Sequence, residues 1–404
     1  MLTMEQNRLL TEVEGDAPMG RMMRARYWIP CGRTASFVAD GAPQRITLLG
    51  RHYVAFRATD GRIGFFDEAC PHRGVSLALA RNEECGLRCI FHGWKFDVSG
   101  KVTEIPSEDD RGARLAERVE VKHYPTFEGG GILWVFLGDG RPPPRPPLPF
   151  LSLDEEHIWV SRSVTPCNWF QGVEGTIDSI HVGTLHQSWI RSKSPDGSKI
   201  GLSLQSHPRY EVEDTSYGLR AAALRELGDG RQYIRVTEYV MPFVSLVPGG
   251  GARDGTIFIA TPIDNNSHML FWGFWDEDKP RIHAEKRMTT GAPRDDDSYA
   301  HVAPGPDWTW GQDRTAMAEG HFTGLTGCIL EEDMIVQASM GPIVDRTKEN
   351  LCSSDLGLVQ ARRRLLAELA AFERGEEPEL LPEVIRPLDT IADADLTWRE
   401  LVKA

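Results

Sequence analysis

Two short Cys/His motifs constrain the fold of this chain more than any other feature of its sequence. The first is Cys70-Pro-His72, the second is Cys89-Ile-Phe-His92, and residues 73–88 separate them. Each motif stands beside turn-forming residues, so each can form a tight loop that presents one thiolate and one imidazole. Two such loops could present four ligands to one metal centre.

The mixture of thiolate and imidazole on each loop distinguishes two kinds of centre. A Rieske [2Fe–2S] centre binds two Cys on one iron and two His on the other. A structural Cys2His2 zinc site prefers its two Cys on one loop and its two His on the other. The sequence therefore favours the iron–sulfur cluster, with zinc as the alternative. Cys85 is the one rival ligand, because the other cysteines are scattered singly and predicted to be small core hydrophobes: Cys31, Cys167, Cys328 and Cys352.

A second group of metal-binding side chains follows in the segment 174–186. Asp178 and His181 share one face of a helix, so the carboxylate can accept a hydrogen bond from the imidazole ring. His181 and His186 lie about 140° apart around a regular helix, and they converge only if it is bulged or broken near Gly183. Two His and one carboxylate form the facial triad that holds Fe(II). The third ligand must come from elsewhere, and spacing leaves three acids open: Glu331, Glu332 and Asp333.

The chain is predicted to contain two domains joined by a proline-rich linker. Residues 51–57 and 63–67 are typical of a β-hairpin, and the nine-residue segment 141–149 cannot join a helix or a sheet interior. The clearest predicted helix begins near Asp355 and ends near Gly375. We therefore expect an α+β protein with a small all-β domain and a larger mixed domain. The predicted parts are an N-terminal segment that packs on the larger domain (1–25), the small domain (26–140), the linker (141–149) and the larger domain (150–404).

Composition excludes several functional classes. Lys+Arg number 45 and Asp+Glu 59, which gives a net charge of −14, and no basic block is present to bind nucleic acid. No apolar run approaches the roughly 18 residues of a membrane span, and the N-terminus lacks the pattern of a signal peptide. Seven cysteines in a long chain fit a reducing compartment. We expect a cytoplasmic protein that binds neither nucleic acid nor a membrane.

At these residues the chain resembles a known family. Cys70-Pro-His-Arg-Gly74 with Cys89-Ile-Phe-His-Gly-Trp94 is similar to the Rieske motif of the Rieske non-haem iron oxygenases, and Asp178-x2-His181-x4-His186 resembles their mononuclear iron motif. Longer stretches resemble the phthalate dioxygenase group of oxygenase (alpha) components, among them Gln171-Gly-Val-Glu-Gly175 and Met340-Gly-Pro-Ile-Val-Asp-Arg346.

The resemblance implies a role for each candidate residue. Asp178 would bridge the two centres, with His92 as the electron exit and His181 as the electron entry. Glu331 and Glu332 would then be solvated or structural acids. The implied ligands are Cys70, His72, Cys89 and His92 for the [2Fe–2S] cluster, and His181, His186 and Asp333 for the mononuclear iron.

The resemblance also implies a fold, a reaction and partners. The larger domain would have an antiparallel sheet with flanking helices, of the helix-grip (START-like) type. Electrons from NADH would arrive through a separate flavin/iron–sulfur reductase, and O2 would be used in aromatic hydrocarbon catabolism, with cis-dihydroxylation of a carboxylated ring favoured. O-demethylation or mono-oxygenation is the alternative. Because the bridge crosses a subunit interface in the family, a homotrimer or a hexamer is implied.

Two non-enzymatic alternatives remain open at the level of sequence: a Rieske electron carrier without a second iron, and a zinc-stabilised interaction protein. An anionic substrate would need local cations in the catalytic half, although each candidate there could equally be a surface residue. Residues 271–275 could line an aromatic pocket, residues 362–364 are predicted to form a solvated face, and Glu174 lies near the iron or is structural. The candidate cations are Arg209, Arg220, Arg225 and Arg253.

Overall fold

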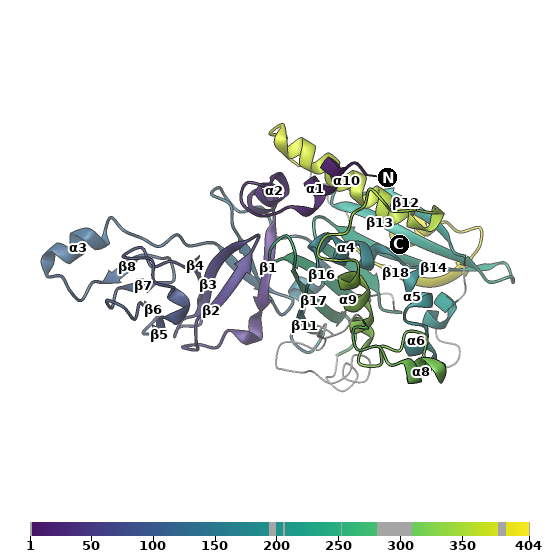
Figure 1. The fold of residues 1–404 in the computed structure, drawn as a ribbon, viewed down its shortest axis with the longest axis horizontal. Helices are drawn as coiled ribbons and strands as arrows, with labels where there is room; N and C mark the ends of the chain where they lie inside the picture. The colour runs from purple at the N-terminus through teal and green to yellow at the C-terminus, as the bar shows by residue number, and fades with distance from the viewer. Residues whose placement is uncertain are drawn as a thin grey trace. The chain divides into compact units, whose positions relative to one another are not determined.

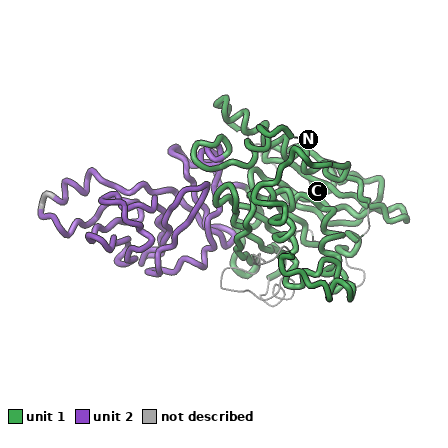
Figure 2. The backbone as a smooth tube through the Cα atoms, in the orientation of Figure 1, with its two compact units in different colours: residues 1–19, 147–404 green, residues 20–146 purple. Residues whose placement is uncertain are grey.

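The computed structural model describes residues 2–193, 199–204, 207–251, 253–280, 309–378 and 385–403. The chain forms two compact units, coloured separately in Figure 2. The small unit comprises residues 20–146, and the large unit comprises residues 1–19 with residues 147–404. The predicted α+β class is confirmed: short antiparallel sheets make up the small unit, and a broad antiparallel sheet with helices makes up the large one. The domain boundaries proposed from the sequence stay a prediction.

The small unit contains three antiparallel sheets, and Figure 1 labels their strands β1 to β8. The first has the order β1-β10-β9, the second β2-β3-β4 and the third β5-β6-β7-β8. The strands are β1 (Trp28–Arg33), β2 (Gln44–Leu48), β3 (Arg51–Arg57), β4 (Ile63–Asp67), β5 (Arg81–Glu83), β6 (Gly86–Arg88), β7 (Lys95–Asp97), β8 (Val102–Glu104), β9 (Thr126–Gly129) and β10 (Ile132–Phe136). The helices are α2 (Pro18–Arg26), which begins in the large unit, η1 (Thr34–Ser36), η2 (Leu77–Leu79) and α3 (Asp110–Ala116).

The predicted hairpin at the centre of this unit is confirmed. Strands β3 and β4 pair antiparallel from Tyr53↔Asp67 to Arg57↔Ile63. The turn between them has Gly61 at a φ of 85°, which favours glycine, and the Asp60 carboxylate accepts the backbone N–H of Arg62 at 3.1 Å. Alternate residues of the hairpin point into one core, which also holds the side chains of Cys70 and Cys89. The hydrophobic core of the small unit therefore anchors both Cys/His loops.

The large unit is built on one eight-stranded antiparallel sheet. Its order is β11-β17-β16-β15-β14-β13-β12, and β18 pairs with β14. The strands are β11 (Ile158–Thr165), β12 (Arg209–Asp214), β13 (Gly218–Glu226), β14 (Arg231–Val240), β15 (Val244–Pro248), β16 (Asp254–Pro262), β17 (His268–Asp276) and β18 (Leu388–Asp393). The helices are α1 (Met4–Thr11), η3 (Pro149–Ser152), α4 (Trp169–Ile177), α5 (His181–Thr184), α6 (Gln187–Lys193), η4 (Lys199–Leu204), α8 (Arg314–Ala318), α9 (Ile329–Ser339), η5 (Ser353–Asp355), α10 (Leu356–Glu373) and α11 (Trp398–Lys403). None of the described helices is long and apolar enough to cross a membrane.

Helices α4 and α9 are packed on the sheet and on each other (Figure 1). The Thr176 hydroxyl of α4 donates to Ser245 Oγ of β15 at 2.7 Å. Leu330 and Met334 of α9 share a buried cluster with Trp272 of β17. These contacts fix α9, which carries Asp333, and α4, which ends at Asp178 just before His181.

A buried ion network joins α4 to α10 and to α1. The Glu174 carboxylate accepts hydrogen bonds from Arg346 at 2.6 and 3.0 Å and from Arg362 at 2.6 Å. Arg346 also donates to Asn7 Oδ1 at 3.0 Å, and Arg362 pairs with Glu349. The prediction of a solvated face at Arg362 is therefore wrong, because its side chain is 3% exposed and neutralises a buried acid.

The charge state of Glu174 follows from its two partners. Burial alone would raise the pKa of Glu174, but the Arg346 and Arg362 guanidinium groups outweigh it and hold the pKa below the usual 4.5. A carboxyl whose pKa is lowered on folding stabilises the fold above its unfolded pKa, and that contribution is lost as the pH falls through the folded value. The network therefore stabilises the large unit at neutral pH.

Replacing Arg346 by Met should destabilise the large unit strongly. Removing one partner of a buried ion pair costs about 3–5 kcal/mol, because the remaining charge stays buried without full compensation. We expect the apparent melting temperature of the Arg346→Met variant to fall by roughly 10 °C in calorimetry. The matched control is Arg8→Met, which removes an exposed ion pair of α1 with Glu12 and should change the melting temperature little. Equal small shifts in both variants would contradict the structural role of the network.

Candidate metal centres

The two Cys/His loops of the small unit have the same backbone hydrogen bonds. In the first, Cys70 accepts the N–H of Gly74 at 2.8 Å and donates its own N–H to Val75 at 2.8 Å. In the second, the carbonyl of Cys89 accepts the N–H of Gly93, and its N–H donates to Trp94. Both glycines adopt a positive φ of about 77° that favours glycine. The loops are therefore two copies of one tight turn.

The side chains of the loops form a thiol pair and an imidazole pair. Burial and the neighbouring Cys89 thiol raise the pKa of Cys70 to about 11. The rings of His72 and His92 have centroids 4.5 Å apart, and His72 stacks on Trp94 at 4.7 Å. A donor set divided into two thiolates and two imidazoles fits a [2Fe–2S] cluster with two Cys on one iron and two His on the other.

The two alternatives for this centre fit less well. A single tetrahedral zinc ion needs its donor atoms within about 4 Å of one another. Among the described residues, such a group of three or more donor atoms, all within 4.8 Å of one another, is found in the large unit and not at the Cys/His loops. The donor atoms of the two loops are therefore too far apart to hold one zinc ion. The rival ligand Cys85 faces the β3–β4 turn, where its N–H donates to Thr59 and its thiol contacts the Asp60 carboxylate.

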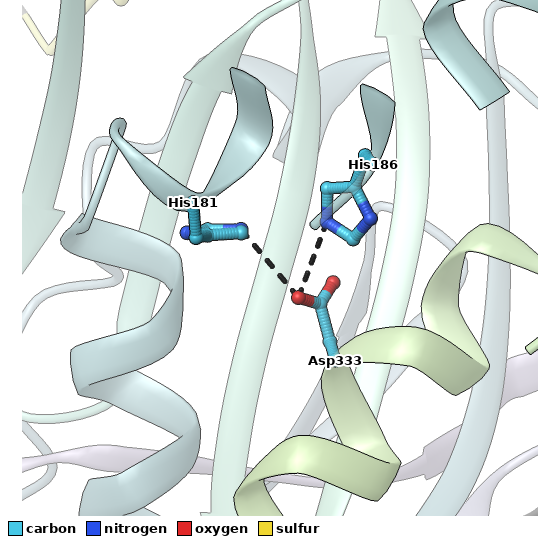
Figure 3. A group of neighbouring side chains, drawn as sticks. All are labelled: His181, His186 and Asp333. Carbon is cyan, nitrogen blue, oxygen red and sulfur yellow. Dashed lines mark ion pairs between the residues drawn. The ribbon is translucent and has the colours of Figure 1, made fainter. Parts of the chain in front are cut away.

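The group in the large unit is the predicted triad (Figure 3). Nε2 of His186 lies 3.2 Å from Oδ1 of Asp333, and Nε2 of His181 lies 3.5 Å from the same oxygen. One ligand atom from each of the three residues lies within 4.8 Å of the others. Two imidazoles and one carboxylate at this separation can hold one Fe(II) ion with open positions for other ligands.

A break in the helix brings the two histidines together. Helix α4 ends at Ile177, α5 covers only His181–Thr184, and α6 begins at Gln187, so His186 lies between two short helices. The predicted break between the two histidines is confirmed, and it begins two residues after Gly183. Gly183 lies inside α5, where a Cβ atom would come within 2.0 Å of the Ser203 carbonyl oxygen of η4. The glycine is needed for the close approach of that backbone.

Glu332 orients His186, a role that the sequence reasoning missed. Its Oε2 lies 2.8 Å from Nδ1 of His186, and its other oxygen accepts the hydroxyl of Thr323. Glu332 is fully buried, so it is not a solvated acid. Burial alone would lower the pKa of His186, but Asp333 and Glu332 outweigh it and raise the pKa to about 10. The resulting negative potential favours a bound cation.

Asp178 orients His181 in a similar way. It caps the end of α4, and its Oδ1 accepts the backbone N–H of Ile180 at 2.7 Å. Its Oδ2 lies 3.5 Å from Nδ1 of His181, which leaves Nε2 of the same ring directed at Asp333. Burial would raise the pKa of Asp178, but His181 and two backbone N–H groups lower it. The contact of Asp178 with His92 stays a prediction.

A cavity of about 600 Å³ opens beside the triad, between α4, α9 and the sheet. This volume suits a small organic ligand. Trp272 and Phe274 of β17 line it, whereas Phe271 and Trp275 point to the other face of the sheet and are not among its lining residues. The predicted aromatic pocket is therefore formed by alternate residues of the segment 271–275, as the two-residue period of a strand requires.

The four arginines proposed as substrate cations are absent from the cavity lining that the described residues form. Three of them pair with acids elsewhere, and the fourth lies over an aromatic ring. The pairs are Arg209 with Glu211, Arg220 with Glu238, and Arg253 with Glu277, while Arg225 lies over Tyr233.

Two other cations line the cavity, Lys199 of η4 and Arg235 of β14. Both face Asp389 of β18: Lys199 Nζ lies 3.3 Å from Oδ1, and Arg235 Nη1 lies 3.6 Å from Oδ2. Arg235 and Asp389 are direct cross-strand partners in the β14–β18 pair. Two cations around one carboxylate leave a net positive charge at this wall of the cavity. Nothing local in the sequence marks these residues, because the three come from segments far apart in the chain.

Two family comparisons together cover most of the chain. Residues 27–125 match the Rieske [2Fe-2S] domain, and residues 135–402 match the LigXa C-terminal domain like family. The chain is 39% identical to the phthalate 4,5-dioxygenase oxygenase subunit of Pseudomonas putida, over 99% of this chain and 94% of that one. It is 34% identical to the 3-chlorobenzoate-3,4-dioxygenase oxygenase subunit of Comamonas testosteroni, over 92% and 90%.

The chain is also similar to a relative whose name gives a different reaction, and its fold is similar to that of a separate solved structure. The chain is 31% identical to the 5,5'-dehydrodivanillate O-demethylase oxygenase subunit of a Sphingobium species, over 94% of this chain and 84% of that one. Its fold matches the terminal oxygenase of carbazole 1,9a-dioxygenase from Novosphingobium sp. KA1, with a TM-score of 0.60 and 19% identity over 89% and 94% of the two chains.

The three neighbouring acids of α9 should differ sharply in their effect on iron binding. Asp333→Asn should lower the iron content from about three to about two per chain, because a direct ligand is lost while the [2Fe–2S] cluster remains. Glu332→Gln should weaken Fe(II) binding by roughly 10–100-fold, the usual cost of altering a group that orients a ligand. Metal analysis and Fe(II) titration of the metal-depleted triad measure both effects.

Glu331→Gln is the matched control in this series. Its carboxylate lies against Gly327 near the start of α9 and outside the triad, so the variant should bind iron as the parent chain does. The visible spectrum of the cluster serves as an internal standard for folding in all three variants. If Glu331→Gln lost the mononuclear iron and Asp333→Asn retained it, the third ligand would be Glu331 and not Asp333.

Proposed function

Because this chain belongs to the Rieske non-haem iron oxygenases, we propose that it is a terminal oxygenase component that hydroxylates an aromatic carboxylate. Its cofactors are a Rieske [2Fe–2S] cluster and a mononuclear non-haem iron. Membership in this enzyme family sets aside the non-enzymatic carrier and the zinc protein. The observation that carries the proposal is the position of the triad, which forms part of the wall of a cavity that also has aromatic and cationic walls.

We propose the following ligands for the two centres. The cluster is held by Cys70, His72, Cys89 and His92, and the mononuclear iron by His181, His186 and Asp333. The pairing of thiols and of imidazoles supports the first set, and the shared approach to Asp333 supports the second. Asp178 is the electron-transfer bridge between the centres, a role that its contact with the ring of His181 supports.

The cavity suits an aromatic ring that bears a carboxylate. Trp272, Phe274 and Phe258 provide an apolar aromatic wall, and Lys199 with Arg235 can hold an anion through charge-assisted hydrogen bonds. The protein carries a net charge of −14, so a cationic wall is required to attract an anionic substrate to this position. Names of two relatives, phthalate 4,5-dioxygenase and 3-chlorobenzoate-3,4-dioxygenase, refer to substrates of the same kind.

The chain's own residues would bind and orient the substrate for the reaction. When bound, the cluster and the mononuclear iron supply electrons and the activation of O2. Lys199 and Arg235 would fix the carboxylate, and the apolar wall would exclude water from the ring. Glu332 and Asp178 would keep Nε2 of each histidine directed at the metal position by holding its Nδ1. Because the ring pose decides which carbons face the triad, these contacts would set the position of hydroxylation.

The electrons would come from NADH through a separate flavin/iron–sulfur reductase. The sequence contains no glycine-rich phosphate loop that opens a helix after a strand, so nothing indicates that this chain binds NADH itself. Structures of similar fold include oxygenase–ferredoxin complexes of carbazole 1,9a-dioxygenase, in which the redox partner is a separate protein. We further propose a homotrimer or a hexamer in which Asp178 contacts His92 of a neighbouring chain.

The favoured reaction is cis-dihydroxylation, and O-demethylation or mono-oxygenation is the alternative. The similarity to an O-demethylase oxygenase subunit supports the alternative. The deciding experiment supplies the oxygenase with NADH, a compatible reductase and 18O2, and then identifies products from a panel of benzoates, phthalates and methoxybenzoates by mass spectrometry. Incorporation of both 18O atoms into one ring identifies dihydroxylation. No oxygenated product from any aromatic acid would refute the proposed substrate class.

Asp178→Asn should uncouple the two centres without removing either. With Fe(II) supplied in excess, we expect the iron content and the cluster spectrum to be unchanged and turnover with the reductase to fall by roughly 10–100-fold, the usual cost in activity of altering a group that orients a metal ligand. Rapid-reaction spectroscopy should show a cluster that is reduced normally and reoxidised slowly. Asp154→Asn, which changes an exposed acid on the surface, is the control and should turn over normally. Normal turnover of Asp178→Asn would exclude the bridge.

Lys199→Met and Arg235→Met should each weaken binding of an aromatic carboxylate. A hydrogen bond to a charged group contributes about 1.5–3 kcal/mol, so we expect KM for phthalate to rise roughly 10–100-fold. Arg253→Met is the control, because that arginine is about half-exposed and paired with Glu277 outside the cavity lining. An unchanged KM in both cavity variants would show that this wall does not hold the carboxylate.

A further inference from the structure

Asp389 of β18 places a negative charge within the cationic wall of the cavity. It lines the cavity together with Lys199 and Arg235. The side chain of Lys199 is 33% exposed, whereas those of Arg235 and Asp389 are 7% and 1% exposed. Lys199 is therefore the group that a ligand in the cavity reaches most readily, and Asp389 acts on such a ligand through its charge and not through contact.

The surrounding residues fix Asp389 in this position. The hydroxyl of the buried Tyr233 donates to its Oδ2 at 3.1 Å, and Nη1 of Arg235 lies 3.6 Å from the same oxygen. Lys199 Nζ lies 3.3 Å from Oδ1, and it donates to the backbone carbonyl of Asp389 at 2.8 Å. This last hydrogen bond does not depend on the carboxylate, so it should survive replacement of Asp389 by asparagine.

The charges around the cavity leave room for one anionic group. Among the lining residues that the structure describes, the lysines and arginines are Lys199 and Arg235, and Asp389 cancels one of their two positive charges. At the triad, Asp333 and the two acids that orient the histidines carry three negative charges, more than the two positive charges of an Fe(II) ion. A second carboxylate on the ligand would therefore be buried among acids without a counter-charge, which costs free energy.

We propose that Asp389 is a specificity-determining residue that limits the cationic wall to one carboxylate, so that the site favours an aromatic monocarboxylate over a dicarboxylate. This proposal rests on the proposed function, in which Lys199 and Arg235 bind the carboxylate of the substrate. Specificity is a difference between two affinities, and an uncompensated charge on the wrong ligand is one way to create it. Asp389 creates that difference by lowering the net charge of the wall.

Calorimetric binding of ligands that differ in charge but not in shape tests this assignment without depending on turnover. Phthalate, isophthalate and terephthalate are each compared with the monoamide of the same acid at neutral pH, where every free carboxyl is ionised. The wild-type holoenzyme should bind the monoamide of at least one pair about tenfold more tightly than the diacid, because the additional charge has no partner. Asp389→Asn should reverse the order for the same pair, because the wall then carries a second uncompensated positive charge.

Two further variants separate the charge of Asp389 from its structural contacts. The double variant Asp389→Asn/Lys199→Met returns the wall to a single positive charge, so it should restore the preference for the monoamide. Asp393→Asn removes an exposed acid at the end of the same strand, outside the described cavity lining, and is the matched control that should keep the wild-type order. Retention of the mononuclear iron shows in each variant that the large unit is folded.

The possible outcomes separate this proposal from the proposed function. If the wild type binds every diacid at least as tightly as its monoamide, the assignment of Asp389 is overturned, and this comparison decides even where a variant fails to fold. An equal loss of affinity for both members of each pair in Asp389→Asn also overturns it, because that pattern indicates a structural role. Benzoate and the neutral benzamide test the proposed function itself: if the wild type binds benzoate no more tightly than benzamide, the cationic wall holds no carboxylate and both proposals fail.

Discussion

The approach of two imidazoles to the single carboxylate of Asp333 is the constraint on which the large unit depends. A regular helix would point His181 and His186 in different directions, so α5 and α6 must be short and separate. Each ring is oriented by a second acid. Asp178, at the end of α4, contacts His181, and Glu332, inside α9, contacts His186. Five polar side chains in one partly buried site are tolerable only because each one satisfies another.

A second buried ion network holds the helices around the triad in place. Glu174 belongs to the helix that Asp178 caps, and its two arginines connect that helix to α10 and α1. The position of the triad is therefore coupled to segments at both ends of the sequence. This coupling explains why residues with no direct contact with the metal site are charged and fully buried.

The sequence predicted features whose parts lie close together in the chain. The hairpin of β3 and β4, the two Cys/His loops and the break between His181 and His186 follow from local spacing and turn residues. The triad's third ligand was selected by resemblance, since Glu331, Glu332 and Asp333 are equivalent in spacing. Contacts between distant segments were missed: Arg362 was expected in solvent, Glu332 was expected to be solvated or structural, and the cavity cations were sought among the wrong arginines. Their roles depend on pairing across more than a hundred residues, which no local pattern reports.

The pairing of β18 with β14 makes the chemistry of the cavity depend on strand register. Arg235 and Asp389 face each other directly across this pair, and side chains alternate between the two faces of a strand. A slip of a single residue would keep most of the backbone hydrogen bonds but turn Asp389 to the opposite face of the sheet. The two cations would then lose the anion between them and repel each other. An insertion or deletion in the connection before β18 could therefore change the ligand preference of this fold. No cavity-lining residue would need to be substituted.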